Sequence, residues 1–392
     1  MTNLPQGWEV KKLEEIANIK GGKRLPKGEN LLDNNTKFAY IRVADFQDNG
    51  TINLQNIKFI NENTYNVLKN YKIYDDNLYI SIAGTIGKSG IIPKELNGAI
   101  LTENAVKLEY IQNNISNKFM YFFTLSNIFK TQIQTSTKIV AQPKLAITRL
   151  KQIQIPLPPL KEQERIVGIL DESFAKIDES IKILEQDLLN LDELMQSALQ
   201  KAFNPLKDNA KENYKLPQSW EWKSLEEISE NISAGGDKPK NCTESKTAKN
   251  QIPVYANGVN NNGLVGYTDK ATIIKPSLTI SARGTIGFVC IRKEPYFPIV
   301  RLISLIPCEN ILCLHYLYFC LNFFIAKGEG SSIPQLTIPK FKSLQIPLPP
   351  LKEQEQIAEH LDFVFEKAKA LKELYTKELK DYEELKQSLL DK

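Results

Sequence analysis

The sequence predicts an α+β protein in which two similar globular domains, rich in strands and carrying short helices, alternate with two long helices as an internal pseudo-two-fold repeat. Three observations predict this fold. The eleven residues QIPLPPLKEQE occur twice, at 154–164 and 345–355. Each copy precedes a long heptad pattern, and each half opens on a similar segment, at 8–16 and 220–228. Eleven identical residues in halves that otherwise differ indicate a diverged tandem repeat.

The duplicated stretch predicts a strand followed directly by a helix. Apolar residues alternate with polar residues or proline through 153–157, as in an edge strand. The prolines that follow exclude a central strand and a helix interior, but proline is well tolerated in a first helical turn. The glutamates of KEQE then place negative charge near the positive end of the helix dipole. We therefore expect helices to begin at about Leu160 and Leu351.

Both predicted helices carry apolar residues spaced alternately by four and three. The first seam comprises Leu170, Phe174, Ile177, Ile181, Leu184, Leu188, Leu191 and Met195. The second comprises Ile357, Leu361, Val364, Ala368, Leu371, Tyr375, Tyr382, Leu385 and Leu389. Such a seam requires a partner helix. We expect the two helices to pair with each other as an antiparallel coiled coil, and a partner helix from another chain is the alternative. About 40 residues at about 1.5 Å each make a rod of roughly 60 Å, the length of a spacer.

These patterns divide the chain into four segments. The first globular domain is expected at 1–155 and the second at 205–346. The regions of the two spacer helices are expected at 156–204 and 347–392, and Asn204-Pro205 ends the first of them.

Composition places the chain among ordinary globular proteins of 392 residues. No segment has the pattern of a signal peptide, and the most apolar run, 311–326, is shorter than the ~20 residues of a bilayer span. We interpret that run as a buried helix and expect no membrane partner. The five cysteines are an odd number without CxxC spacing, which favours the reducing cytoplasm over a disulfide framework.

Charge is distributed unevenly although the net charge is only +4. Residues 161–203 hold 10 acidic against 5 basic residues, and 352–392 hold 11 against 8, so the helices are acidic and the globular domains are basic. A basic surface suits a polyanion, although this excess is modest.

Three segments of the globular domains carry candidate contacts. A Gly-Gly pair, at 21–22 and 235–236, leads a basic loop whose backbone N–H groups could bind phosphate, or which is a solvated turn. The pattern ISxxGTIG, at 80–87 and 280–287, predicts strand, tight turn and strand, so its glycines are interpreted as structural. The segment 254–267 is dense in asparagine, which pairs with adenine but also forms turns.

No catalytic constellation is recognisable. The two histidines, His315 and His360, lie in an apolar run and on an acidic helix, so neither a Ser-His-Asp triad nor a metal cluster can be assembled. Gly87-Lys88-Ser89 fails as a phosphate loop because Ile82 stands where the first glycine belongs. A glycine-rich cofactor loop and an [ND]PP[YF] tetrapeptide are also absent from the sequence. We predict a non-catalytic protein without a metal or cofactor of its own.

The order of globular domain, PLPPLKEQE helix, globular domain and PLPPLKEQE helix resembles the specificity (S) subunit of type I restriction-modification systems. The ISxxGTIG turns and the basic loop after Gly-Gly in each domain belong to the same resemblance, which spans nearly the entire chain. It implies that the globular domains are target recognition domains for double-stranded DNA. It also implies that the helices space them and dock methyltransferase (M) subunits, two of them expected, with restriction (R) subunits joining for cleavage. S-adenosylmethionine is expected on the methyltransferase.

The matching motifs nominate the residues. The expected DNA contacts are Lys23, Arg24, Lys27 and Lys88 in the first domain, and Lys238, Lys240, Asn257, Asn260, Asn261, Asn262 and Arg283 in the second. The expected docking residues are Glu162, Glu164, Arg165, Glu353 and Glu355, and helix capping is the alternative role for these acids. Because the two domains differ, the DNA site should be asymmetric and bipartite. A coiled-coil scaffold with weakly nucleic-acid-binding domains is the alternative function.

Overall fold

The computed structural model describes residues 4–136, 144–203, 217, 219–325, 328–329 and 336–391. The chain forms two compact units, Met1–Leu184 with Lys377–Lys392, and Glu185–Thr376. The long helices α6 (Leu160–Phe203) and α10 (Leu351–Leu390) each contribute to both units. They begin at the two leucines that the sequence predicts, while Asn204-Pro205 lies outside the described residues.

The first unit contains two four-stranded sheets and one two-stranded sheet. Its sheet orders are β2-β9-β6-β7, β4-β3-β8-β5 and β1-β10. The strands are β1 (Glu9–Lys12), β2 (Ala17–Gly21), β3 (Ala39–Ile41), β4 (Lys58–Phe59), β5 (Lys72–Ile73), β6 (Leu78–Ser81), β7 (Ser89–Ile91), β8 (Ala99–Leu101), β9 (Ala105–Tyr110) and β10 (Gln154–Leu157). The helices are α1 (Leu13–Ile16), α2 (Glu62–Val67), α3 (Asn117–Leu125), α4 (Asn127–Ser136) and α5 (Ile147–Leu150).

The second unit repeats the main features. Its largest sheet has the order β12-β19-β15-β17, and smaller sheets have the orders β14-β13-β18, β11-β21 and β16-β20. The strands are β11 (Glu221–Ser224), β12 (Ser229–Ala234), β13 (Ile252–Tyr255), β14 (Leu264–Thr268), β15 (Ser277–Ile280), β16 (Thr285–Ile286), β17 (Val289–Arg292), β18 (Phe297–Pro298), β19 (Ile303–Pro307), β20 (Gly328–Glu329) and β21 (Gln345–Leu348). The helices are α7 (Leu225–Ile228), α8 (Leu314–Phe324) and α9 (Ile338–Lys342).

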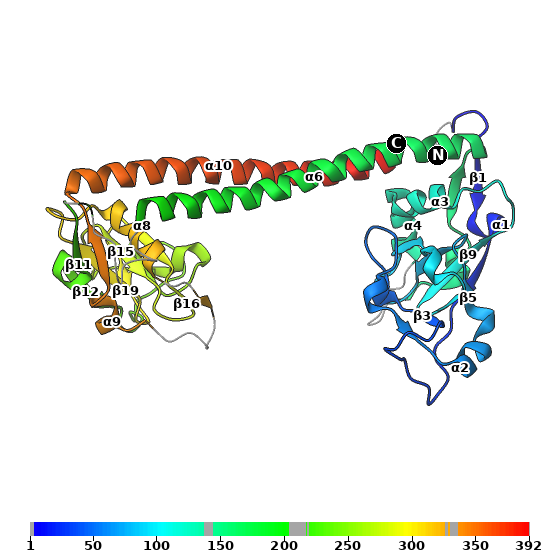
Figure 1. Ribbon diagram of the computed structural model, residues 1–392, viewed down its shortest axis with the longest axis horizontal. Helices are drawn as coiled ribbons and strands as arrows, with labels where there is room; N and C mark the ends of the chain where they lie inside the picture. The colour runs from blue at the N-terminus through cyan, green and yellow to red at the C-terminus, as the bar shows by residue number, and fades with distance from the viewer. Residues whose placement is uncertain are drawn as a thin grey trace. The chain divides into compact units, whose positions relative to one another are not determined.

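Each aromatic helix packs against a four-stranded sheet of its unit, α3 against β6 and β7 and α8 against β15 and β17. Figure 1 labels both helices. Met120 of α3 and Leu317 of α8 are fully buried in the main cores. Burying one such side chain contributes about 1.5–3 kcal/mol, so these helices anchor the sheets. The apolar run around Leu317 is therefore a core helix, as predicted.

The strand that precedes each long helix has the predicted edge character. β10 pairs antiparallel with β1, and β21 pairs in the same way with β11, each in a sheet of two strands. Pro156 faces Val10 in the first pair, and Pro347 faces Trp222 in the second. Proline fits because an edge strand does not need every ladder donor.

Strand β3 is short and covers only Ala39–Ile41. Asp45 is the physical reason. Its buried carboxylate accepts hydrogen bonds from the backbone N–H of Arg42 (2.7 Å) and from the Arg42 guanidinium (2.6 Å to Nη2). These bonds turn the chain into a 3₁₀ helix at Val43–Asp45.

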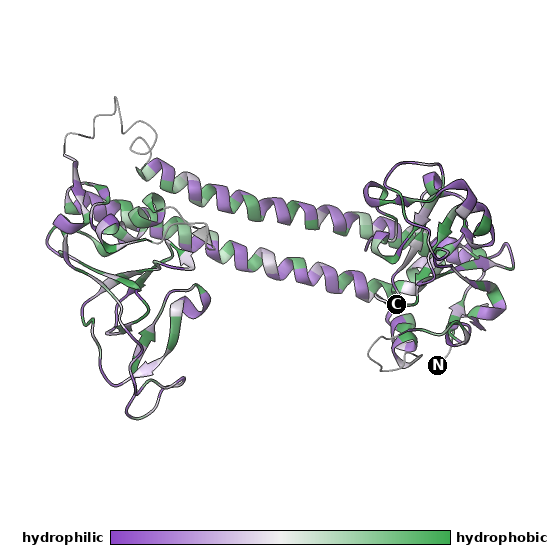
Figure 2. Ribbon diagram, turned by 90° about the horizontal axis from the view of Figure 1, so that it is seen from below, coloured by the Kyte–Doolittle hydropathy of each residue, from purple (hydrophilic) through white to green (hydrophobic). Residues whose placement is uncertain are grey.

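α6 and α10 pair antiparallel. In the first unit Lys386 of α10 forms an ion pair with Asp178 of α6, and in the second unit Lys372 forms one with Asp192. From the first pair to the second, the residue number increases on α6 and decreases on α10, so the two helices run in opposite directions. The predicted internal coiled coil is confirmed, and Figure 2 shows apolar and polar residues interleaved along both helices.

The apolar seam residues are more deeply buried on α6 than on α10. The side chains at every second seam position of α6 are buried: Leu170, Ile177, Leu184 and Leu191. On α10 Leu361 and Ala368 are buried, but Leu371 and Leu385 are 38% and 43% exposed. The heptad pattern therefore overestimates the burial of α10. No helix among the described residues is long and apolar enough to cross a membrane.

Candidate nucleic-acid interface

An asparagine loop projects between β13 and β14 of the second unit. It is closed by a hydrogen bond from the Ala256 N–H to the Gly263 carbonyl (2.8 Å). Asn261 and Asn262 have φ of 48° and 52°, a region that asparagine tolerates better than most residues. Together with Asn260 they are exposed. Three predicted DNA contacts therefore form the tip of one loop, where amide groups are available to a base edge.

A buried cation supports this tip. The Arg292 side chain is 8% exposed, and its guanidinium lies 3.6 Å from the ring centroid of Tyr255. It donates one hydrogen bond to Thr279 Oγ1 (3.0 Å) and another to the carbonyl of Asn262. Stacking and hydrogen bonding fix the base of the loop, so the asparagines are presented on a rigid support.

Asn257 differs from the asparagines at the loop tip because its side-chain amide is hydrogen-bonded within the protein. Its Nδ2 donates to the Val300 carbonyl, and its Oδ1 accepts from the Ala282 N–H at 2.8 Å. Both ends of the amide are thus engaged by backbone groups of two other loops. The structure makes Asn257 a bridge that holds three loops together, whereas sequence reasoning had grouped it with the base-contacting asparagines.

The ISxxGTIG segments form the predicted strand, turn and strand. In the first unit the Ser81 N–H donates to the Lys88 carbonyl (2.8 Å), and in the second the Ser281 N–H donates to the Phe288 carbonyl (2.9 Å). Their glycines adopt positive φ, for example 75° at Gly84, which is why glycine is required there.

The two cations beside these turns differ in their surroundings. Arg283 is exposed and has no ion pair with another described residue. Lys88 is 23% exposed and pairs at 2.8 Å with the fully exposed carboxylate of Asp48. Because the Asp48 carboxylate is fully exposed, this ion pair is screened by water and contributes little, so a DNA phosphate could replace Asp48.

One glycine of each Gly-Gly pair, Gly22 and Gly235, is explained by close packing. The Gly22 N–H donates to the Ala105 carbonyl (3.0 Å), and the Gly235 N–H donates to the Leu302 carbonyl (2.9 Å). A Cβ on Gly22 would lie 2.1 Å from the Thr102 carbonyl oxygen. These donors are used within the protein, so the hypothesis of an anion site at these N–H groups is not supported.

The basic loops that follow the glycines expose their cations. Lys23, Lys27, Lys238 and Lys240 are all exposed. The Arg24 guanidinium donates from Nε to Glu103 Oε1 at 2.6 Å, and its side chain is 79% exposed. Burial raises the pKa of Glu103, but Arg24 and Thr102 outweigh it and hold that pKa below its ordinary value. Glu103 therefore stays ionised and competes with DNA for Arg24.

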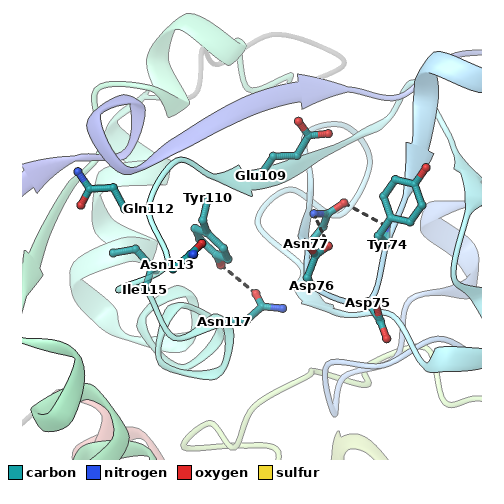
Figure 3. Close-up of a pocket in the computed structure, with 10 residues that line it drawn as sticks. All are labelled: Tyr74, Asp75, Asp76, Asn77, Glu109, Tyr110, Gln112, Asn113, Ile115 and Asn117. Atoms are coloured by element: carbon teal, nitrogen blue, oxygen red, sulfur yellow. Dashed lines mark hydrogen bonds between the residues drawn. The ribbon is translucent and has the colours of Figure 1, made fainter.

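A cavity of about 520 Å³ in the first unit is lined by three carboxylates, of which only Glu109 forms ion pairs, with Lys20 and Lys107, among the described residues. Figure 3 shows Asp75, Asp76 and Glu109 among its lining residues, and Tyr110 donates to Asn117 Oδ1 at 2.9 Å. Carboxylates repel a polyanion. This cavity is therefore excluded from the candidate DNA surface.

Comparison with known proteins decides the family. The model of a family described as the type I restriction modification DNA specificity domain matches residues 5–188 and 217–380, one match in each half of the chain. The chain belongs to the type I restriction-modification specificity subunits.

Relatives of this specificity subunit are spread over bacteria and archaea. A Mycoplasma pneumoniae protein named as a type I specificity subunit is 29% identical over 357 residues, which cover 90% of this chain and 87% of that protein. The specificity subunit of the Escherichia coli type I restriction enzyme EcoBI is 29% identical over 205 residues, or 51% of this chain and 42% of that protein. A Methanocaldococcus jannaschii protein named as the MjaX specificity subunit is 24% identical over 99% of this chain and 93% of its own length.

Solved structures share the fold of this specificity subunit. One chain, from a study of complex assembly and conformational transition of the type I R-M system, matches with a TM-score of 0.81 at 19% identity, covering 100% of this chain and 98% of that one. The HsdS subunit from Thermoanaerobacter tengcongensis matches with a TM-score of 0.62 at 19% identity, covering 99% and 96%.

The predicted docking residues of the specificity subunit are partly engaged in local contacts. The Arg165 Nη2 lies 2.8 Å from Glu162 Oε1 on the same face of α6. Glu353 accepts a hydrogen bond from the Trp220 indole at 3.1 Å. Glu164 and Glu355 are exposed. Surface carboxylates with local partners contribute little net binding energy, so these acids alone do not define an interface.

Two large apolar side chains on α10 are exposed, and sequence reasoning did not single them out. Phe363 is 61% exposed and Leu374 is 55% exposed, and they lie eleven residues apart, which places them on one face of the helix. Neither residue belongs to the predicted heptad seam. Large apolar residues outside the seam of a coiled-coil helix are therefore the sequence signal that could have identified them. A groove of about 570 Å³ between α6 and α10 lies in the same unit, lined in part by Glu353 and Leu361. These two side chains make α10 a candidate surface for a protein partner.

Proposed function

We propose that this chain directs a methyltransferase to an asymmetric, bipartite DNA site, with each globular domain reading one half of the site. The observation that carries this proposal is that the two domains share one fold but differ in the loops that they expose. Both halves share the ISxxGTIG turn, but the asparagine tip and its Arg292 support belong to the second half, where the first has Ile92 in the place of Arg292. Two different readers on one chain require two different half-sites.

The helices are proposed to set the gap between the half-sites. α6 has 44 residues, which at about 1.5 Å each amount to roughly 66 Å. This exceeds the ~34 Å that separates successive major grooves on one face of DNA. The bases between the half-sites would then be spanned without being read.

The chemistry is proposed to reside on the partners. Two methyltransferase subunits would dock on the exposed apolar face of α10 around Phe363 and Leu374, and on the docking residues nominated from the sequence. They would bring S-adenosylmethionine and methylate adenine, and restriction subunits would add cleavage. The candidate DNA contacts divide by chemistry. Lysines position the protein on phosphates, while the asparagine tip and Arg283 specify bases.

Genome-wide mapping of N6-methyladenine tests this function. The chain is co-expressed with the methyltransferase subunit from its own locus, and single-molecule sequencing reads the methylated positions. We expect one asymmetric motif of two parts with a fixed gap. A complex that forms and binds its cofactor, yet leaves DNA unmethylated, would contradict the proposal and favour the scaffold alternative. The family match does not support that alternative.

A further inference from the structure

A turn between β18 and β19 has an unusual backbone. Val300 and Arg301 have φ of 53° and 59°, so two consecutive residues other than glycine lie in the left-handed region. The Leu302 N–H donates to the Ile299 carbonyl at 3.0 Å and closes the turn. Turns of this kind strongly prefer Asn-Gly, and a β-branched residue there is strained. Folding alone does not explain why valine and arginine, rather than asparagine and glycine, occupy this turn.

The surrounding backbone holds the strained turn in place. The Val300 and Arg301 N–H groups donate at 2.8 Å to the carbonyls of Gly236 and Gly235. A Cβ on Gly235 would come 2.6 Å from the Ile299 nitrogen, so glycine is required for this approach. The turn is thus fixed by its partners, and its two side chains point from a rigid base.

The same turn lies against the loops already assigned to DNA. Asn257 donates to the Val300 carbonyl and accepts from the Ala282 N–H, so one amide links this turn to the turn of Arg283. The Gly258 N–H also donates to Ser281 Oγ at 3.3 Å. Three loops therefore meet, and they carry Arg301, Arg283 and the asparagine tip.

Both arginines have unused donors. Neither the Arg283 nor the Arg301 side chain has a hydrogen bond or ion pair with any residue that the structure describes. Arg292, in contrast, is buried and satisfied beneath the asparagine tip. A free guanidinium presents five N–H donors in a planar fork, which matches O6 and N7 of guanine. Val300, 51% exposed, adds an apolar group beside that fork.

The corresponding turn of the first unit has other chemistry. There the Ala105 N–H donates to the Thr102 carbonyl at 3.2 Å, which places Glu103 and Asn104 where the second unit has Val300 and Arg301. Neither has a positive φ. Glu103 is occupied by Arg24. The strained, cationic turn is therefore a property of the second unit alone.

We propose that Arg301 is a base-reading residue that contacts a guanine in the major groove of the second half-site, with Val300 packed against the neighbouring base. This proposal rests on the proposed function and adds a reading element to it.

The test is the methylation motif of the complex that contains Arg301→Gly. Glycine accepts positive φ without strain, so this variant keeps the fold, and its thermal transition should not fall. We expect discrimination at one G·C position of one half-site to drop about 10- to 100-fold, while the gap and the other half-site stay unchanged. Arg301→Lys should also relax that position, because lysine keeps the charge but loses the fork. Asn104→Gly is the matched control in the first unit and should leave that position intact.

Four outcomes overturn the proposal, and they can be distinguished from one another. An unchanged motif with Arg301→Gly, or a wild-type half-site lacking G·C pairs, removes the base contact while the proposed function stands. Rescue by Arg301→Lys, with loss uniform over all sequences for the glycine variant, assigns Arg301 to a phosphate instead. Absence of any bipartite motif with the wild-type chain overturns the proposed function itself.

Discussion

Gln163 and Gln354 make the same three hydrogen bonds, each in its own unit. The Gln163 Oε1 accepts from the Ser116 N–H (2.8 Å), and its Nε2 donates to the carbonyls of Asn114 (3.1 Å) and Pro158 (2.8 Å). Gln354 accepts from the Cys313 N–H (2.9 Å) and donates to the carbonyls of Ile311 (2.9 Å) and Pro349 (2.8 Å). Both side chains are at most 1% exposed. The glutamine of KEQE therefore locks each long helix to the start of the aromatic helix that covers its core.

Replacing Gln354 by leucine should destabilise the second unit. The change leaves one buried N–H and two buried carbonyls without partners, which costs roughly 2–4 kcal/mol. Urea unfolding followed by tryptophan fluorescence checks this, because Trp220 and Trp222 both lie in the second unit. The exposed residue Gln356 provides the control, because Gln356→Leu should change the free energy of unfolding by less than about 0.5 kcal/mol. A loss of under 1 kcal/mol in Gln354→Leu would refute the lock.

Arg24→Ala should weaken DNA binding equally for all sequences. As a phosphate contact from an exposed side chain, Arg24 would contribute roughly 3- to 10-fold at ~0.1 M salt and about one unit of the salt slope. Titration of the assembled complex at several salt concentrations measures both quantities. Arg24→Lys retains the charge and should retain most of the affinity.

Glu103→Gln should have the opposite effect, because it removes the carboxylate that holds Arg24 within the protein. We expect a modestly tighter complex with an unchanged methylation motif. If affinity falls in Glu103→Gln as it does in Arg24→Ala, the ion pair itself shapes the surface, and Arg24 does not act on phosphate.

Phe363→Ala should impair assembly with the methyltransferase while leaving the chain folded. Its side chain is 61% exposed, so its removal creates no cavity, whereas an apolar anchor at an interface contributes about 1–4 kcal/mol to binding. Size-exclusion chromatography of the mixed subunits detects the loss of complex. Leu361→Ala, at a fully buried seam position, should instead cost about 2–5 kcal/mol of stability. Normal assembly by the Phe363 variant would move the docking surface elsewhere.

Stability of the first unit should fall in mild acid through Glu109. Burial raises the pKa of Glu109, but the ammonium groups of Lys107 and Lys20 outweigh it and hold that pKa below 4.5. A carboxylate with a lowered pKa in the fold stabilises it above pH ~4.5, and the contribution disappears as the pH falls through the folded-state pKa. Urea midpoints between pH 7 and pH 3.5 should show this, and Glu109→Gln should flatten part of the slope. If the urea midpoint of the variant falls as steeply with decreasing pH, Glu109 is not a source of the pH dependence of stability.

The sequence predicted the elements whose causes are local. Prolines and glutamates within a few residues set the starts of α6 and α10, and both helices begin at the expected leucines. The ISxxGTIG turns were predictable because glycine at positive φ is a local requirement. The heptads gave the antiparallel pair but not its tightness on α10, since burial depends on what the partner helix presents.

The candidate site was predicted less completely, because its partners are distant in sequence. Asn257 resembles its neighbours in composition, and only the approach of Val300 and Ala282 makes it a bridge. The Val300-Arg301 turn carries no motif, so nothing in the sequence singled it out. For the glycine pairs the sequence left an anion site and a solvated turn both open, and only the structure shows that the Gly22 and Gly235 N–H groups donate to distant carbonyls.

The sequence by itself determined the repeat, the order of domains and helices, and the family they resemble, because these follow from residues adjacent in the chain. Only the tertiary structure decided which polar side chains are available to DNA. Arg24 meets Glu103 across 79 residues, and Lys88 meets Asp48 from another loop, whereas Arg283 and Arg301 meet no described partner. Whether a charge is free depends on neighbours that folding brings together.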